Sequence, residues 1–422
     1  MLTTLAAPAF ADIWHIEDGD ITVKAGETGN DVTQKGTTTY GDTDTIITNS
    51  DKNTASSHTV TIEANDKDDK VEVTLKDVNI DTSSRNKAAV SVTGSGNTTI
   101  KLDGDNALKS DSSRSGIYGS GSLTITGGEN DSLTAQGGSG ANGIYSSGSL
   151  TISGGSTVTA NGGNGTISGG NCIYSSSGVA ISGGAVTANG GDSKDGSGGN
   201  GIYSSSSVAI SGGTVTATGG DSTGSDGSGG NGIYSRNGSI DLSGSLELTA
   251  KAGSPNGKAL SQNGRELDLD TIKDKLGPGA KVTATDANGE TKQVSIPRPV
   301  EPEGPVIPGD SSSSSDGGSA APSAPAFSLP GLTVTDKDGQ RISYTSTQSG
   351  NTLTVCVGRF TASFRISLAA LRQLRAEGIE TIAFQTILCS TTLSVDELLA
   401  MGSEDAEAVL THRFTDSSLT VG

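Results

Sequence analysis

A three-residue motif recurs through the middle of this chain at a nearly constant interval. The motif is Gly-Ile-Tyr, with cysteine in place of glycine once, and successive copies start 27, 29, 29 and 31 residues apart. A unit of this length cannot bury an apolar face alone, so neighbouring units must stack and share one core. The repeat therefore predicts a solenoid. The five copies start at Gly116, Gly143, Cys172, Gly201 and Gly232.

Each unit contains three short segments with β-strand character. In the unit that starts at Gly143, apolar residues alternate with polar ones at Leu150 and Ile152, and again at Val158 and Ala160. This period of two is typical of strands that bury one face. Gly-Gly pairs between the segments supply sharp corners and argue against a helical repeat. The pattern predicts a parallel β-helix with three strands per coil, whose variable loops all lie on one edge.

Composition and charge exclude several classes of protein. The formal net charge of −19 argues against nucleic acid as a partner. No apolar run approaches the roughly 18 residues that a membrane span needs. Three cysteines and three histidines are too few for a zinc cluster or a disulfide framework. Cys172 replaces a repeat glycine and is expected to be an isolated buried thiol, whereas Cys356 and Cys389 share one small domain and could pair.

The repeat and its surroundings divide the chain into six segments. Ala-Phe-Ala before Asp12 is typical of a signal-peptide cleavage site and predicts a secreted or cell-surface protein. A run rich in Pro and Ser predicts a linker, and a helix is expected after it, from Ser367 as N-cap to Gly378. The predicted segments are a signal-peptide remnant (1–11), an N-terminal cap with irregular coils (12–115), the regular Gly-Ile-Tyr coils (116–256), a capping helix and hairpin (257–296), the linker (297–326) and an α+β domain of unknown function (327–422).

Two of these segments contain a hairpin signal. Asn288-Gly289 separates two strand-like runs and follows a short amphipathic segment at 267–276 that predicts a helix. Asp338-Gly339 predicts a similar turn near the start of the last domain. The helix and the first hairpin are expected to close the end of the solenoid, since exposed terminal strands invite aggregation.

Stacked units place equivalent residues in columns. Each tyrosine of the motif should face outward because its isoleucine faces inward, and sugar rings stack on aromatic faces, so this column is the candidate carbohydrate-binding site. The alternative is a self-stacked ladder that stabilises the coil register. An asparagine column is expected to hydrogen-bond along the axis, and a threonine column faces outward, although Ala185 interrupts the row beside it and argues against ice binding. The columns are Tyr118, Tyr145, Tyr174, Tyr203 and Tyr234; Asn142, Asn171, Asn200, Asn231 and Asn256; and Thr134, Thr159, Thr187, Thr216 and Thr249.

Carboxylates are concentrated at two predicted turns of the irregular coils. Such oxygen-rich turns suit Ca²⁺, which takes six to eight oxygen ligands, although neither turn matches an EF-hand loop. The alternative is a solvated acidic turn. The candidate calcium ligands are Asp66, Asp68, Asp69, Asp103 and Asp105.

Signals of catalysis are weak. His15, His58 and His412 are scattered, without a Ser/His/Asp or Cys/His arrangement. A glycosidase needs two carboxylates across one bond, and the regular coils offer only scattered acids in or near corners and loops. Lys and Arg, the usual bases of a β-elimination, are nearly absent from these coils.

The repeats resemble the right-handed parallel β-helices related in shape to pectate lyases. The run KVEVTLKDVNIDTSSRNKAAVSVTGSGNTTIKLDGDNALKS, residues 70–110, resembles exported carbohydrate-binding β-helix proteins of Clostridia and related gut Firmicutes. The resemblance covers roughly residues 12–256. It implies an all-β, right-handed parallel β-helix, binding of acidic plant polysaccharides with bound calcium, and no strong lyase activity.

The expected function is non-catalytic binding of an extracellular carbohydrate. The expected partner is an acidic polysaccharide of plant or host origin, such as a polyuronate. Its binding would need the assistance of Ca²⁺, because an acidic protein otherwise repels it. The alternative is a surface stalk or adhesin that displays the α+β domain. A polysaccharide lyase is the third and weakest hypothesis.

Overall fold

The computed structural model describes residues 12–297 and parts of the C-terminal domain, namely 332–336, 340–342, 344–349, 351–357, 359, 361–386, 390–401, 406–412 and 417–421. Inter-residue contacts divide the chain into two compact units, Met1–Val306 and Ile307–Gly422, so the boundary falls inside the predicted linker. The predicted signal-peptide remnant and the linker beyond Pro297 lie outside the described residues.

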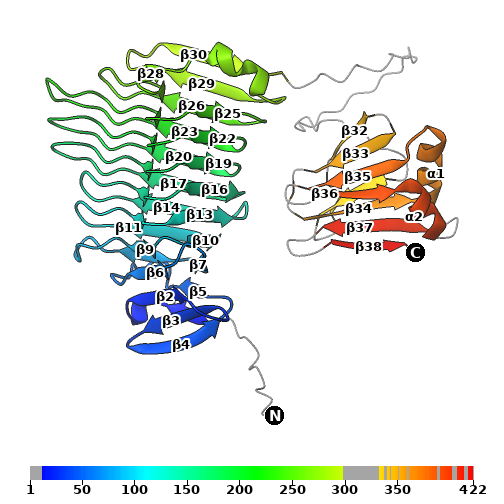
Figure 1. Ribbon diagram of the computed structural model, residues 1–422, viewed down its shortest axis with the longest axis horizontal. Coiled ribbons are helices and arrows are strands. Elements are labelled where there is room, and N and C mark those ends of the chain that lie inside the picture. The colour runs from blue at the N-terminus through cyan, green and yellow to red at the C-terminus, as the bar shows by residue number, and fades with distance from the viewer. Residues whose placement is uncertain are drawn as a thin grey trace, which may run out of the picture. The chain divides into compact units, whose positions relative to one another are not determined.

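The first unit is a parallel β-helix with three strands per regular coil, which confirms the predicted fold class. The strands of successive coils pair in parallel and form three long sheets, here named A, B and C. Figure 1 shows the coils stacked one on another. Sheet A contains β1 (Ile13–His15), β5 (Ile46–Thr48), β7 (Lys70–Lys76), β10 (Asn97–Asp103), β13 (Ser122–Gly127), β16 (Leu150–Gly154), β19 (Val179–Ile181), β22 (Val208–Ile210) and β25 (Ile240–Leu242).

Sheets B and C complete each coil. Sheet B contains β2 (Ile21–Ala25), β6 (Val60–Ala64), β9 (Val90–Gly94), β12 (Ile117–Gly119), β15 (Ile144–Ser146), β18 (Ile173–Ser175), β21 (Ile202–Ser204), β24 (Ile233–Ser235) and β27 (Leu260–Gln262). Sheet C contains β8 (Asn79–Asp81), β11 (Asp105–Lys109), β14 (Ser132–Gln136), β17 (Thr157–Asn161), β20 (Ala185–Asn189), β23 (Thr214–Thr218), β26 (Glu247–Lys251) and β29 (Lys281–Thr285).

Antiparallel additions close both ends of the solenoid. At the N-terminal end, β3 (Asn30–Gln34) pairs with β2, and β4 (Thr37–Asp42) pairs with β3. A short 3-10 helix, Ile16–Asp18, lies between β1 and β2. At the other end, β28 (Arg265–Glu266) pairs with β27, and β30 (Thr291–Ser295) pairs with β29 around the predicted turn at Asn288-Gly289. The helix predicted at 267–276 is present as 3-10 turns over Leu269–Lys275.

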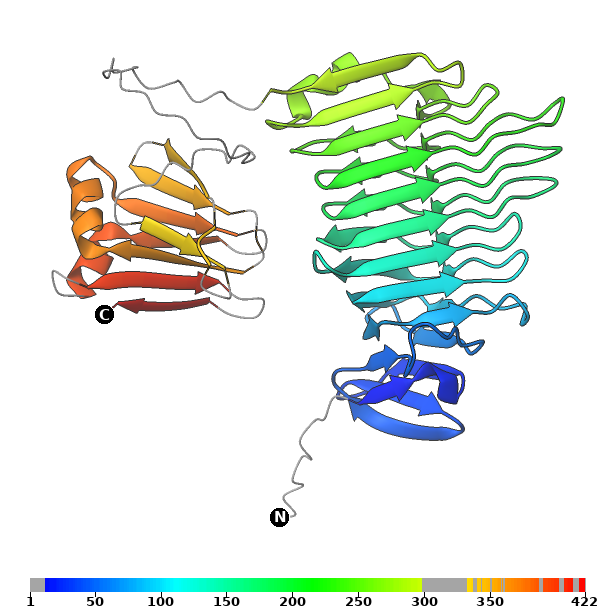
Figure 2. The ribbon, with the colours of Figure 1, turned by 180° about the vertical axis from the view of Figure 1, so that it is seen from behind.

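The variable loops join sheet C to sheet B and lie on one edge, as predicted. Figures 1 and 2 show them as long projections stacked above one another. Bridges from Gly165 to Ser193 and from Ser193 to Ser222 continue the coil-to-coil pairing into these loops. Close stacking explains their glycines, since a Cβ on Gly191 would collide with the carbonyl group of Gly163.

A narrow apolar core runs through the solenoid. The isoleucine of every Gly-Ile-Tyr motif is fully buried, and sheets A and C contribute their own inward rows. Cys172 is also fully buried and unpaired, as predicted, and its thiol donates to the carbonyl of Ala160 at 2.8 Å. Burial raises the pKa of this thiol. Cys389 lies outside the described residues, so its predicted pairing with Cys356 stays a prediction.

The second unit is a small α+β domain, as predicted. One sheet contains β31 (Leu332–Thr335), β34 (Ala362–Ser367), β37 (Glu407–His412) and β38 (Ser417–Val421), and the other contains β32 (Thr345–Ser349), β33 (Thr352–Cys356), β35 (Thr381–Gln385) and β36 (Ser390–Ser394). The turn predicted at Asp338-Gly339 lies outside the described residues.

Two helices belong to this domain. Helix α1 (Leu368–Ala376) begins where predicted, with the hydroxyl of Ser367 accepting from the amide of Ala370 at 3.2 Å. Helix α2 (Val395–Met401) was not predicted. Across the described parts of the chain, no helix has the length and apolar character needed to cross a bilayer.

Replacing a core isoleucine tests the shared core. Ile173→Ala removes fully buried atoms and should lower the free energy of unfolding by about 2–5 kcal/mol. Thr157→Ala changes an exposed side chain of sheet C and should change it by less than about 0.5 kcal/mol. Urea denaturation followed by circular dichroism measures both, and equal midpoints for the two variants would contradict a packed interior at Ile173.

Candidate functional site

The five motif tyrosines lie in one column on the outer face of sheet B. Strand pairing aligns each tyrosine with the next, while the preceding isoleucines align inside the solenoid. The same outward column contains Thr61 and Ser91 before the first tyrosine and Ser261 after the last. The structure thus brings together all five residues predicted to bind carbohydrate.

Four of the five rings are stacked in parallel. The ring centroids of Tyr118 and Tyr145 are 5.0 Å apart with planes inclined by 3°. The next two pairs, ending at Tyr203, have centroid separations of 4.9 and 4.7 Å and inclinations of 12° and 7°. Stacked aromatic pairs of this kind stabilise the column. Tyr234 departs from it, since its ring meets that of Tyr203 edge-on at 81° and 5.4 Å.

The two ends of the column differ. Tyr118 follows a rung that carries Ser91, so no aromatic ring covers its outer side. It is the most exposed of the five, with 43% of its surface accessible, whereas the other four are half-buried. At the opposite end Arg236 hydrogen-bonds to Tyr203, which raises the pKa of the guanidinium. The aromatic surface that is open to a ligand is therefore concentrated at Tyr118.

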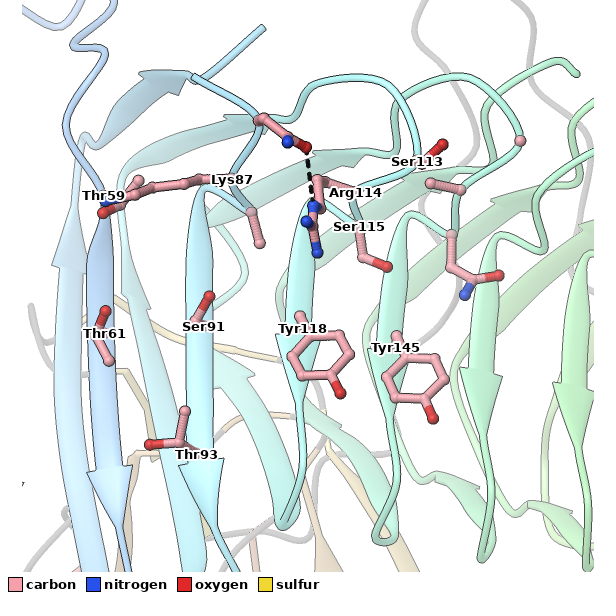
Figure 3. A pocket seen from close by; sticks show the side chains of 15 residues that line it. Thr59, Thr61, Lys87, Ser91, Thr93, Ser113, Arg114, Ser115, Tyr118 and Tyr145 are labelled. Atoms are coloured by element: carbon pink, nitrogen blue, oxygen red, sulfur yellow. Dashed lines mark hydrogen bonds between the residues drawn. The ribbon is translucent and has the colours of Figure 1, made fainter. Parts of the chain in front are cut away.

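A groove of about 670 Å³ begins at this open end. Its floor is the outer face of sheet B, where Ser91, Tyr118 and Tyr145 stand on adjacent strands, as Figure 3 shows. Loops that precede these strands form one wall. The groove is also lined by Thr61, Asn86, Lys87, Arg114 and Asn142.

The charge of this groove is opposite to that of the whole chain. Lys87 and Arg114 line it, and none of its lining residues, all within the described range 12–297, is an Asp, Glu or His. Arg114 donates from Nε to Oδ1 of Asn86 at 3.1 Å. In a chain of net charge −19, this local excess of cations favours an anionic or electron-rich ligand.

Asp20 anchors Lys87, one of the residues that line the groove. Its carboxylate accepts from the two terminal nitrogens of Arg85 at 2.7 and 3.0 Å and from Lys87 at 3.2 Å. Partial burial alone would raise the pKa of Asp20, but the hydrogen bonds from Arg85, the Thr59 amide and Lys87 outweigh it and hold that pKa well below its usual range. Lys87 is thus already paired, whereas Arg114 makes no ion pair within residues 12–297.

Sequence reasoning missed these loop residues. Only positions that recur in every unit were considered as candidates. Asn86 and Arg114 belong to irregular coils that lack the motif, so they were not among them. The sequence does contain a signal for this site. The first ring of a ladder, that of Tyr118, has one uncovered face, and the loop just before it carries a cation, Arg114.

The asparagine column is a hydrogen-bonded ladder, with one correction. Oδ1 of Asn142, Asn171 and Asn200 each accepts from the backbone and side-chain nitrogens of the next asparagine, at 2.7–3.3 Å. Oδ1 of Asn231 accepts from the amide of Lys258 at 2.9 Å, so the prediction of Asn256 as the fifth member was wrong. The last coil lacks the tyrosine motif, and pairing of Ile233 with Leu260 places Lys258 at that position.

The threonine column on sheet C is also in register. Pairing aligns its five members and adds Thr283 on β29. The neighbouring outward row is irregular, because Ala185, Glu247 and Lys281 interrupt its hydroxyl groups. The row therefore lacks the regular hydroxyl lattice that an ice-binding surface would need.

The five predicted calcium ligands lie at two different corners. Asp66, Asp68 and Asp69 occupy the turn from β6 to β7, where the amide of Asp66 donates to Asp69 Oδ2 at 2.9 Å. Asp103 and Asp105 flank the corner from β10 to β11 and face Lys76 and Lys52, respectively. In the part of the chain that the structure describes, no three His, Cys, Asp or Glu side chains form a cluster that could hold a metal ion. The structure does not bring the five together.

Comparisons with protein-family models, with curated proteins and with solved structures found no match.

Removing one amide of the ladder tests its structural role. Asn200→Ala leaves the backbone amide of Asn231 without its side-chain acceptor, which should lower the free energy of unfolding by about 1–3 kcal/mol. Asn256→Gly is the matched control, because Asn256 is exposed, has a φ of +63° and lies outside the ladder. Urea denaturation midpoints measure the stability of both variants. A larger loss of stability for Asn256→Gly than for Asn200→Ala would contradict the placement of Asn200 in the ladder and of Asn256 outside it.

Proposed function

We propose that this protein is a non-catalytic extracellular carbohydrate-binding protein that holds an acidic polysaccharide of plant or host origin along sheet B. The observation that supports this best is the groove at Tyr118, where aromatic rings, hydroxyl and amide groups, and two cations line one surface without a carboxylate. Each of these groups complements a part of an acidic sugar.

Sugar chemistry matches the groove in three ways. The C–H face of a pyranose ring stacks on an aromatic ring such as Tyr118, whose outer face no other ring covers. Its hydroxyl groups exchange hydrogen bonds with Ser, Thr and Asn side chains such as Thr61, Ser91 and Asn142. Its carboxylate, where one is present, pairs with a cation. A polymer laid along the column meets successive rungs every 4.8 Å or so.

A second function, as a surface stalk or adhesin, has its own supporting observation. Tyr145 and Tyr174 each have a ring on both sides, so part of the column stabilises its own register whether or not sugar binds. The C-terminal domain forms a separate compact unit that such a stalk would display. A polysaccharide lyase stays the weakest of the three hypotheses.

Truncation of Tyr118, the ring with an uncovered face, distinguishes carbohydrate binding from a role as a surface stalk or adhesin. Tyr118→Ala should weaken binding of polygalacturonate and of a neutral glycan alike by about tenfold, since lost stacking and apolar contact amount to roughly 1–2 kcal/mol. Tyr234→Ala removes the ring at the far end of the column, outside the groove, and should weaken binding far less. Isothermal titration of the full chain measures both.

The outcomes of that titration decide between the functions. Normal glycan binding by Tyr118→Ala would show that the tyrosine column has only a structural role. A wild-type protein that binds no glycan at all would favour the stalk.

Calcium assistance is tested with the polymer. We expect chelator to weaken binding of polygalacturonate, and Asp66→Ala with Asp68→Ala to weaken it as well, because these exposed carboxylates make no ion pair within residues 12–297 and follow β6, a strand of the groove floor. Asp103→Ala with Asp105→Ala is the matched control, since lysines already face both carboxylates. If chelator leaves the affinity for polygalacturonate unchanged, the hypothesis of a calcium bridge is wrong.

A further inference from the structure

Arg114 is held in place at the groove by its own loop and by the next one. Its amide donates to the carbonyl of Asp111 at 3.0 Å, and its carbonyl accepts from the amide of Gly138 at 2.9 Å. The following residue, Ser115, is buried, and its carbonyl accepts from the hydroxyl of Ser110 at 2.7 Å. The backbone on both sides of Arg114 is therefore anchored, although its side chain is exposed.

The guanidinium of Arg114 keeps its outer edge available. Nε is occupied by Asn86, which fixes one side of the planar group. The two terminal nitrogens are not engaged by any carboxylate within residues 12–297. Figure 3 shows this side chain descending from the loop toward the strand that carries Tyr118. By contrast, Arg85 and Arg375 each have a carboxylate partner.

The neighbouring charges leave the guanidinium attractive to an anion. Asp20 lies opposite two cations, Arg85 and Lys87, so this cluster is itself not negative. Asp111, in the same loop as Arg114, lines a different groove, on the sheet C side of the loops. The planar fork of an arginine matches both oxygens of a carboxylate at once, which a lysine cannot do.

We propose that Arg114, oriented by Asn86, directly binds the carboxylate of a uronate residue whose ring lies on Tyr118, and that this contact needs no bridging metal ion. The inference rests on the proposed carbohydrate-binding function and assigns its specificity for acidic sugars to one residue. Calcium would then assist long polymers at other carboxylates, while a short uronate relies on Arg114.

The test compares an acidic ligand with its neutral form in the presence of chelator. Titration of the full chain with a short oligogalacturonate and with its methyl ester should show tighter binding of the acid, by about tenfold. Arg114→Gln should abolish that preference, because it weakens binding of the acid far more than binding of the methyl ester. Asn86→Ala should reduce the preference partly, and Arg236→Gln, at the other end of the column, should not alter it.

The results that would overturn the proposal are distinct from failure of the function itself. Arg114→Gln that retains the preference for the acid, or a wild-type preference that disappears in chelator, would overturn it. Binding of a sulfated oligosaccharide in place of the uronate would overturn the assignment of a carboxylate. A wild-type protein that binds neither the acid nor the ester would instead refute carbohydrate binding.

Discussion

Parallel pairing of every coil with the next, residue against equivalent residue, is the constraint on which the rest of this structure depends. Within the regular coils the pairing of sheets A, B and C shows no shift of register. A slip of one residue would turn the inward isoleucines to solvent and the tyrosines to the core. The same register that builds the core therefore builds the outward columns.

The register also explains the unusual composition. Because successive coils share one narrow interior, 31% hydrophobic residues are sufficient for a long solenoid. Where backbones pass close to one another at a corner, they leave no room for a side chain. At Gly184, for example, φ is +73° and a Cβ would collide with the carbonyl of Ser156.

Features that repeat could be predicted from sequence, and features that occur once could not. The three-strand coils, the tyrosine column and the loops on one edge follow from periodicity alone. Asn256 was assigned to the ladder wrongly because the last coil lacks the Gly-Ile-Tyr motif from which ladder positions are counted. Helix α2 was missed although Ser394 precedes it, because its seven residues are too few for a clear apolar period. The groove wall was missed because Asn86 and Arg114 meet only through the pairing of irregular coils.

A crystal structure of the protein with a bound short oligogalacturonate tests the central claim most directly. The account predicts a uronate ring against Tyr118, with its carboxylate within hydrogen-bond distance of the terminal nitrogens of Arg114. It also predicts that the parallel stack from Tyr118 to Tyr203 is unchanged. A ligand bound elsewhere, with the groove at Tyr118 filled only by water, would contradict it.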